Sequence, residues 1–310
     1  MINRIQTLVV AIGCITLCLI AFSCSTLDPV TAAKMKKMES LLNGADPNFR
    51  SAVMKMIDKG VDSSYIYDIL HHPNTKFIEK MVKINVTGFI KRADYSHNYN
   101  DASLIAARAF LQENTEKLHN VESLTGVSAE VITAILWVET KFGKITGTNN
   151  VISVYTSLAA ADEQRYIDMN KQSFREYVFS ADSIAMLDSV VEARARKKAN
   201  WAVDQLIALQ SMQPRMAIPI NDLLGSWAGA FGWSQFIPSS YMSWAVDGDG
   251  DGKVDLYNKL DAMASVGNYL KVNGWGATRA EQEKAVFHYN NSKDYVDCVL
   301  TLADKIKPGN

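Results

Sequence analysis

The sequence predicts a mainly α-helical protein, and three observations support this. Apolar residues recur every three or four positions through residues 49–86, residues 102–124 are amphipathic at the same spacing, and the charge-rich residues 162–212 keep a helical period. The chain has 310 residues, of which 48% are hydrophobic and 21% charged. This is enough to bury the core of one large domain or two modest ones.

The overall charge argues against two classes of partner. The chain carries 32 basic and 33 acidic residues, which gives a formal net charge of −1. Nucleic acids and anionic membrane surfaces attract strongly basic chains, so neither is expected as a partner on this ground. Partners must therefore be inferred from local motifs.

Residues 1–23 have the pattern of a secretory signal peptide. Arg4 provides the positive start, and residues 8–22 are apolar but too short for a membrane span. Residues 24–48 are polar with a lysine cluster, and we interpret them as a tether that runs into a first helix. The protein is therefore expected to be exported.

The predicted signal ends in Ala21-Phe-Ser-Cys24, which resembles a bacterial lipoprotein processing site. We expect Cys24 to become a lipidated N-terminus, and Ser25 after it favours an outer-membrane anchor facing the periplasm. The alternative is ordinary cleavage nearby that leaves Cys24 as a free thiol. If Cys24 is acylated, Cys298 has no partner in the mature chain, and no disulfide is predicted.

The chain between residues 49 and 161 predicts a series of helices. Gly60 and His72-Pro73 break the pattern of residues 49–86 into two or three short helices. Residues 102–124 predict one long amphipathic helix, and residues 151–161 a further apolar one.

Residues 127–143 predict a short, largely buried helix that carries one acid. Ser128 is the expected N-cap and Gly143 the expected C-terminal stop. Glu139 lies on the same stripe as apolar residues one and two turns earlier. Burial raises the pKa of a carboxyl group, which suits a general acid that works near neutral pH.

The same helix allows a second interpretation of its acid. Glu139 could lie at the edge of the apolar stripe and pair with Lys141 or Lys144. Taken alone, the helix favours this ion pair. The choice depends on the motifs that follow.

Residues 225–241 read GSWAGAFGWSQFIPSSY and combine three glycines with five aromatic residues. Glycines let the backbone approach a ligand closely, and flat rings can stack on sugars. Ser226 and Gln235 add hydrogen-bonding groups. The pattern is typical of a sugar-binding groove, and tight helix packing with an internally bonded Gln235 is the alternative.

Residues 247–258 match the calcium loop of an EF-hand. The expected metal ligands are Asp247, Asp249, Asp251, the backbone carbonyl of Lys253, Asp255 and Asn258. Asn258 replaces the usual bidentate Glu, so we expect weaker binding that is completed by water or by Asp261. The alternative, an acidic turn without metal, is disfavoured because its four aspartates would repel one another.

Four segments together resemble the membrane-bound lytic murein transglycosylase B family: Val138-Glu-Thr-Lys-Phe-Gly143, residues 225–241, the loop at Asp247 and Tyr289-Asn-Asn-Ser292. The resemblance extends over residues 49–302. It implies a lysozyme-like, mainly α (α+β) catalytic core with extra N-terminal helices, a small β element and a single EF-hand-like loop. Residues 49–310 would form the catalytic domain.

The resemblance also implies an activity. The family cleaves the β-1,4 bond between N-acetylmuramic acid and N-acetylglucosamine in peptidoglycan without water, leaving a 1,6-anhydromuramoyl end. Glu139 falls on the family's acid/base, and a structural Ca²⁺ is implied. Positions that line the glycan groove are Tyr95, Trp201, Ser226, Gln235, Tyr269, Tyr289 and Asn290. The expected partners are glycan strands and proteins of cell-wall synthesis or hydrolysis, and a monomer is expected.

Residues 162–197 depart from the family pattern and are interpreted as a helical insertion, which makes the preferred substrate length uncertain. A two-carboxylate glycosidase needs a partner acid near the first. No second acid stands out in the motifs, and the candidates are Asp162 and Glu163. A hydrolytic muramidase and a non-catalytic peptidoglycan-binding lipoprotein are the alternative functions.

Overall fold

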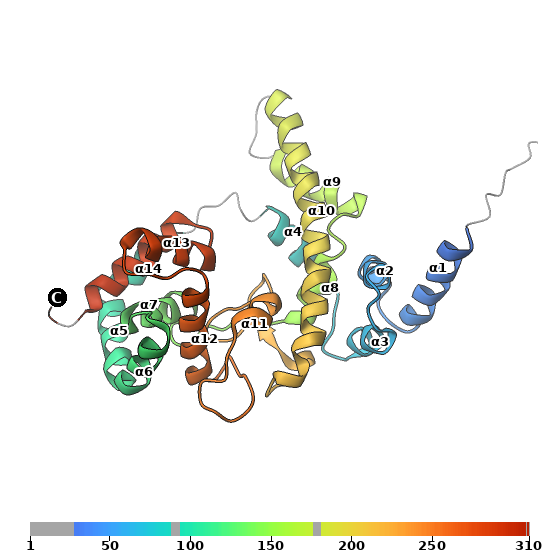
Figure 1. Cartoon of the computed structure of the whole chain (residues 1–310). Coiled ribbons are helices and arrows are strands. Elements are labelled where there is room, and N and C mark those ends of the chain that lie inside the picture. Colours follow the sequence, from blue (N-terminus) through green and yellow to red (C-terminus); the bar gives the residue numbers. More distant parts are fainter. Residues whose placement is uncertain (1–27, 88–93, 176–180, 308, 310) are drawn as a thin grey trace, which may run out of the picture.

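The structure is a computed structural model that describes residues 28–87, 94–175, 181–307 and 309 (Figure 1). The predicted signal peptide, residues 1–23, and the predicted lipidation site, Cys24, lie outside the described residues.

Helices make up most of the described chain. The helices before residue 150 are α1 (Pro29–Leu42), α2 (Arg50–Asp58), α3 (Ser63–His71), α4 (Glu79–Thr87), α5 (Asp101–Glu113), α6 (Thr115–Thr125) and α7 (Ala129–Thr140). Those after it are α8 (Val151–Leu158), α9 (Gln164–Arg175), α10 (Ala181–Met212), α11 (Pro238–Trp244), α12 (Lys259–Val272), α13 (Arg279–Tyr289) and α14 (Lys293–Ile306). Short 3-10 turns are η1 (Pro47–Phe49), η3 (Ser96–Tyr99), η4 (Gln213–Arg215) and η5 (Ile220–Asp222).

A two-stranded antiparallel sheet supplies the small β element. Strand β1 (Asn149–Asn150) pairs with β2 (Leu224–Gly225), with Asn149 opposite Gly225. The sheet joins the segment after α7 to the glycine-rich segment before α11. The predicted α+β class with a mainly helical core is confirmed.

The N-terminal segment is more ordered than a tether. Residues 29–42 form α1, which begins where the Asp28 carboxylate accepts hydrogen bonds from two backbone N–H groups. Met38 and Leu41 are buried in the core. Because these two apolar residues lie in a lysine-rich stretch, the sequence pattern does not show where the helix begins.

The predicted single helix over residues 102–124 is wrong. The helix is interrupted at Asn114, whose side chain donates to the Phe110 carbonyl at 2.8 Å. Thr115 follows and donates its hydroxyl to the Leu111 carbonyl at 3.0 Å. Polar side chains that bond to the backbone of the preceding turn compete with the helical ladder, and here α5 ends and α6 starts.

The helix that carries Glu139 is α7. Its N-cap is Ser128 as predicted, although the Ser128 side chain makes no capping hydrogen bond. The helix ends at Thr140, earlier than the predicted stop at Gly143. Lys141 and Phe142 already have left-handed backbones, with φ of 52° and 59°. A left-handed C-cap does not require glycine when the turn is held by surrounding contacts.

The helices form two groups on either side of the glycine-rich segment (Figure 1). Helix α7 packs against α14, α5, α12 and α6, and α10 packs against α11, α8, α9 and α4. The segment with β2 and α11 lies between α12 and α10 (Figure 1). Residues from both groups can therefore contribute to one site along this segment.

The predicted insertion, residues 162–197, contains α9 and the first half of α10. The two helices pack against each other and both contact α4. Ion pairs join them, with Lys171 Nζ 3.3 Å from Glu192 Oε2 and an Arg175 nitrogen 2.8 Å from Asp188 Oδ2. No single helix of the described chain is long and apolar enough to cross a membrane, and α6 and α7, which reach that length together, are bent by 110°.

Candidate active site

Glu139 lies in the last turn of α7, on a helix whose first two turns are almost entirely buried. Burial raises the pKa of its carboxyl group from 4.5 to about 7. The Tyr295 hydroxyl donates to Glu139 Oε1 at 2.6 Å and opposes this rise, because it stabilises the charged form. The pKa of this group therefore lies near neutral pH.

The ion-pair interpretation of Glu139 is not supported. The Lys141 ammonium donates to the Asn98 side-chain oxygen and to the Trp137 carbonyl, and it lies 4.6 Å from the centre of the Trp137 ring. Its charge lowers the pKa of Glu139, but less than the Tyr295 hydroxyl does. The direct partner of the acid is a neutral hydroxyl.

Asp162 and Glu163, the candidate partner acids, are engaged elsewhere. Asp162 accepts from Lys55 at 2.8 Å, and Glu163 pairs with Arg165 at 2.9 Å. No carboxylate of the described chain is among the groups that shift the pKa of Glu139. The structure therefore brings no second acid against Glu139.

An aromatic wall surrounds the acid. Tyr95 meets Tyr295 edge to face with ring centres 5.7 Å apart, and Tyr289 lies parallel to Tyr295 at 6.4 Å. Tyr269 continues the wall, with its ring centre 4.7 Å from that of Tyr289. Burial raises the pKa values of Tyr95 and Tyr289 most, and the charge on Glu139 raises them further. Both rings therefore lie close enough to Glu139 to interact with its charge. We call Glu139, Tyr95, Tyr289 and Tyr295 the acid pocket.

Hydrogen bonds hold the tyrosines of this wall. The Tyr289 hydroxyl donates to the Ser234 carbonyl at 2.5 Å, and the Tyr269 hydroxyl donates to the His288 carbonyl at 2.7 Å. Asn290 is a hydrogen-bonding partner of the Tyr95 side chain and lowers its pKa. Four of the predicted groove residues, Tyr95, Tyr269, Tyr289 and Asn290, therefore meet beside Glu139.

The glycine-rich segment forms a second edge of the site. Gln235 has a left-handed backbone, with φ of 49°, and its amide donates to the carbonyls of Thr146 at 3.1 Å and Gly232 at 3.0 Å. The amide nitrogen is thus bonded internally, as the packing alternative expected. The segment is nevertheless a turn structure rather than packed helices, so that alternative is only partly correct.

Ser226 and Trp201 lie further along this edge. Ser226 Oγ accepts from the Ala230 N–H at 3.2 Å. The Trp201 ring meets Tyr155 edge to face at 5.5 Å, and the Tyr155 hydroxyl donates to the Gly229 carbonyl at 3.0 Å. Both residues therefore border the loop at residues 226–230, and no contact joins either to Glu139.

The loop at residues 247–261 brings together Asp247 and Asp249 of the predicted ligand set with Asp261, which was expected to complete it. Carboxylate oxygens of Asp247, Asp249 and Asp261 lie within 4.8 Å of one another, an arrangement that can hold a cation. Asn258, the predicted last ligand, instead donates its side-chain amide to Asp249 Oδ2 at 2.5 Å. Asp251 accepts from a backbone N–H and is outside the cluster. We call residues 247–261 the metal loop.

Asp261 occupies a special position in the metal loop. It is 2% exposed and accepts from the N–H groups of Gly248 at 2.8 Å and Asp255 at 2.6 Å. Because it belongs to α12, which starts after Asn258, its side chain turns back under the loop. The three oxygens are hard ligands of the kind that Ca²⁺ prefers, so these residues fit that ion.

The metal loop is joined to the glycine-rich segment. The Trp233 N–H donates to the Leu256 carbonyl at 2.7 Å, and the Tyr257 hydroxyl donates to the Leu224 carbonyl. Gly232 packs so closely on Leu256 that an added Cβ would lie 2.4 Å from the Leu256 Cβ. The loop therefore supports the groove edge but lies apart from the acid pocket.

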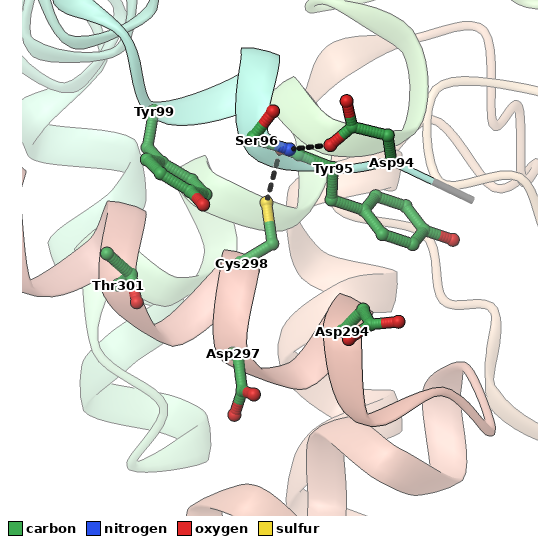
Figure 2. Close-up of a pocket in the computed structure, with 8 residues that line it drawn as sticks. All are labelled: Asp94, Tyr95, Ser96, Tyr99, Asp294, Asp297, Cys298 and Thr301. Carbon is green, nitrogen blue, oxygen red and sulfur yellow. Dashed lines mark hydrogen bonds between the residues drawn. The ribbon is translucent and has the colours of Figure 1, made fainter. Parts of the chain in front are cut away.

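A surface hollow of about 470 Å³ lies behind Tyr95, between η3 and α14. Figure 2 shows its lining: Asp94, Tyr95, Ser96, Tyr99, Asp294, Asp297, Cys298 and Thr301. Cys298 is buried, its thiol lies 3.6 Å from the Tyr95 carbonyl, and it is a free cysteine. The hollow shares only Tyr95 with the acid pocket.

Tyr295 is the functional residue that sequence reasoning missed. It is buried in the first turn of α14, where the Ser292 side chain caps the helix. Its position six residues after Tyr289 makes no helical pairing with that residue, because the chain turns between α13 and α14. An available signal was the Ser292 cap, since it fixes the start of the helix that directs Tyr295 inward.

Comparisons with known proteins identify the family of this chain. A family model described as a transglycosylase SLT domain matches residues 44–283. The membrane-bound lytic murein transglycosylase B of Escherichia coli (strain K12) is 31% identical over 166 residues. That match covers 54% of this chain and 37% of the relative, so the chain spans well under two thirds of the relative's length.

Solved structures show the same fold. The soluble lytic transglycosylase SltB1 from Pseudomonas aeruginosa has a TM-score of 0.62 at 20% identity, and the similarity covers 84% of this chain and 98% of that one. The Escherichia coli lytic transglycosylase Slt35 in complex with calcium has a TM-score of 0.61 at 20% identity, covering 84% and 93%. The predicted lysozyme-like fold class is therefore confirmed.

Proposed function

Because the chain belongs to the transglycosylase SLT domain family, we propose that it is a peptidoglycan lytic transglycosylase. It would cleave the β-1,4 bond between N-acetylmuramic acid and N-acetylglucosamine and leave a 1,6-anhydromuramoyl end. The observation that carries the proposal is Glu139, whose carboxyl pKa burial raises to about 7 in an aromatic pocket without a second acid. Such a group can both give and accept a proton near neutral pH.

In the first step, Glu139 donates its proton to the glycosidic oxygen. The bond from that oxygen to the muramoyl C1 breaks, its electron pair stays on the oxygen, and positive charge develops at C1. The substrate's N-acetyl group or the groove stabilises this charge. The Tyr295 hydroxyl at 2.6 Å stabilises the resulting Glu139 carboxylate.

In the second step, the Glu139 carboxylate takes the proton of the muramoyl C6 hydroxyl, and the C6 oxygen bonds to C1. The acid is restored, no water is consumed, and one carboxylate performs both transfers. Asp162 and Glu163 are held by Lys55 and Arg165, which supports a single-acid mechanism. Most retaining and inverting hydrolases instead use a second carboxylate.

The remaining predicted residues would bind the glycan strand. Tyr95, Tyr269, Tyr289 and Asn290 would contact the sugars beside the broken bond, because they meet next to Glu139. Ser226, Gln235 and Trp201 would bind along the glycine-rich edge. Mass analysis of the products from strands of known length would show whether cleavage is endo or exo.

A structural Ca²⁺ would be held by Asp247, Asp249 and Asp261. When bound, the ion neutralises the mutual repulsion of these carboxylates and fixes the loop. It supplies no proton to the reaction. Slt35, which shares the fold, has been solved in complex with calcium, and this supports the assignment.

We place the protein in the periplasm, anchored to the outer membrane through Cys24, in accord with the signal peptide pattern of residues 1–23. A matched relative is described as membrane-bound. Mass analysis of the mature N-terminus tests this: a diacylglyceryl modification on Cys24 supports it, and an unmodified N-terminus contradicts the anchor.

Digestion of peptidoglycan in ¹⁸O-labelled water tests the reaction. A lytic transglycosylase yields anhydromuropeptides that are one water lighter than reducing ends and contain no ¹⁸O. A hydrolytic muramidase yields reducing ends that contain the label. The absence of any new end would instead favour a non-catalytic peptidoglycan-binding lipoprotein.

A further inference from the structure

We infer that Trp227 is a stacking platform for one sugar ring of the glycan strand, at a subsite beyond those that adjoin Glu139. The inference deepens the proposed function and rests on it. Trp227 is 48% exposed, although large aromatic residues are usually well covered. It lies directly after Ser226 on the glycine-rich segment.

The indole of Trp227 is free of partners among the described residues, unlike those of the other five tryptophans. Ring or cation contacts engage Trp137, Trp201, Trp233 and Trp244, and the Trp275 indole donates to the Gly126 carbonyl. All six tryptophans are described. Within the described part of the chain, no ring contact or indole hydrogen bond ties the Trp227 side chain to the fold.

The backbone that carries Trp227 is nevertheless held firmly. The Ser226 N–H donates to the Ala230 carbonyl at 2.8 Å, and the Gly229 N–H donates to the Ser226 carbonyl at 3.0 Å. From the other side, the Asn85 amide of α4 donates to the Trp227 carbonyl at 3.0 Å. Asn85 is itself only 3% exposed, so this anchor belongs to the core.

The loop is also held at Gly229, two residues after Trp227. Gly229 has φ of 80°, and an added Cβ would lie 2.4 Å from the Tyr155 ring. The Tyr155 hydroxyl donates to the Gly229 carbonyl. The loop is thus fixed on both sides of an exposed indole, which reduces the conformational entropy that a ligand must remove on binding.

The position of Trp227 along the segment supports a glycan as the occupant. One end of the segment reaches the acid helix, where the Thr140 hydroxyl donates to the Trp233 carbonyl at 3.0 Å. The other end carries Trp227 and reaches α4 through Asn85. A strand that follows this segment away from Glu139 would pass the exposed ring.

The chemistry of the Trp227 side chain suits a sugar ring. An indole offers a flat apolar face to the C–H groups on one side of a pyranose ring. Trp201, on the neighbouring edge, has its ring covered by the Lys198 ammonium at 4.2 Å and by Tyr155. Trp227 is therefore the tryptophan of this edge with an open face.

Binding of peptide-free glycan strands to the full chain with Glu139→Gln tests the inference without turnover. Added to this background, Trp227→Ala should raise the Kd for long strands by roughly five- to tenfold. Trp227→Phe should raise the logarithm of the Kd by less than half as much as Trp227→Ala does. The shortest oligosaccharides, which do not reach the subsite, should bind equally to all variants.

Phe287→Ala on the same background is the matched control. Phe287 is 44% exposed on α13, outside the glycine-rich segment, so its removal should leave strand binding unchanged. Equal affinity of Trp227→Ala and its parent for long strands would overturn the inference. If the parent binds no strand, the inference and the proposed glycan function both fail. If the parent binds as expected but the wild type forms no anhydro ends, only the proposed reaction fails.

Discussion

The acid pocket and the metal loop both depend on carboxylates, yet their surroundings give these groups opposite properties. Glu139 has a buried setting and one hydroxyl donor, and its pKa rises to about 7. Asp247 is exposed and accepts from the N–H groups of Gly252 and Gly250, which lower its pKa. The first carboxyl group is adapted to transfer protons, and the second to stay charged.

Burial and hydrogen-bond donors act in opposite directions on the pKa of a carboxyl group, and burial is the larger influence at Glu139. Backbone N–H groups in a turn stabilise charge without burial, as at Asp247. At Glu139, burial excludes water from the carboxyl group, and the Tyr295 hydroxyl is the hydrogen-bond donor to it.

Glu139→Gln should have the largest effect. It removes the group that transfers protons, so peptidoglycan turnover should fall at least about a thousandfold. The variant should remain folded, because the glutamine oxygen can still accept from Tyr295. Product formation measured by muropeptide mass analysis checks this, and retained turnover would contradict the single-acid account.

The Glu139 carboxyl group makes the stability of the wild type depend on pH. Since folding raises the Glu139 pKa from 4.5 to about 7, the wild type loses stability as pH rises through this window, by roughly 3 kcal/mol in all. Glu139→Gln lacks this loss, so its stability relative to wild type should increase from pH 4.5 to pH 8. Urea unfolding at several pH values measures the difference.

Removal of calcium should affect stability rather than proton transfer. Chelation, or Asp261→Asn, should lower the Tm by roughly 5–10 °C, since a ligand bound only to the folded state stabilises it. The pH dependence of turnover should not move. Asp68→Asn, an exposed acid on α3, is the control. An unchanged Tm after chelation would contradict a bound structural ion.

Tyr295→Phe tests the single donor of the acid pocket. Loss of the hydroxyl removes a contact that lowers the Glu139 pKa, so this pKa should rise. The pH above which kcat/KM declines should move upward, with a fall in kcat of roughly tenfold. A downward shift, or none, would show that the Tyr295 hydroxyl does not stabilise the Glu139 carboxylate.

Lys141→Met should have the smallest effect. The Lys141 charge lowers the Glu139 pKa less than the Tyr295 hydroxyl does, so the pH profile should move upward by less than in Tyr295→Phe. Lys144→Met, which removes an exposed charge, is the control. A larger shift for Lys141→Met would support a direct ion pair with Glu139.

Much of the acid pocket could be predicted from the sequence. The local helix pattern and the family resemblance indicate Glu139, and the resemblance alone indicates Tyr95 and Tyr289, which lie beside it in the structure. Tyr295 could not be found this way. Its contact with Glu139 joins residues 156 positions apart, and the approach depends on how α14 packs against α7.

Other features also depend on tertiary packing. Asp261, expected to complete the metal loop, reaches Asp247 and Asp249 because α12 turns its first residues back under the loop. The break at Asn114 depends on side-chain bonds to the backbone, to which hydrophobic periodicity is insensitive. Local sequence patterns therefore predict most of the helices, whereas side-chain contacts between distant residues depend on tertiary packing.

A carbon-13 NMR titration of the Glu139 carboxyl group in the full chain tests the central claim most directly. We predict one titration step with a pKa near 7, without coupling to another carboxylate. A pKa near the ordinary value of 4.5, or two coupled steps, would contradict a single buried acid that performs both proton transfers.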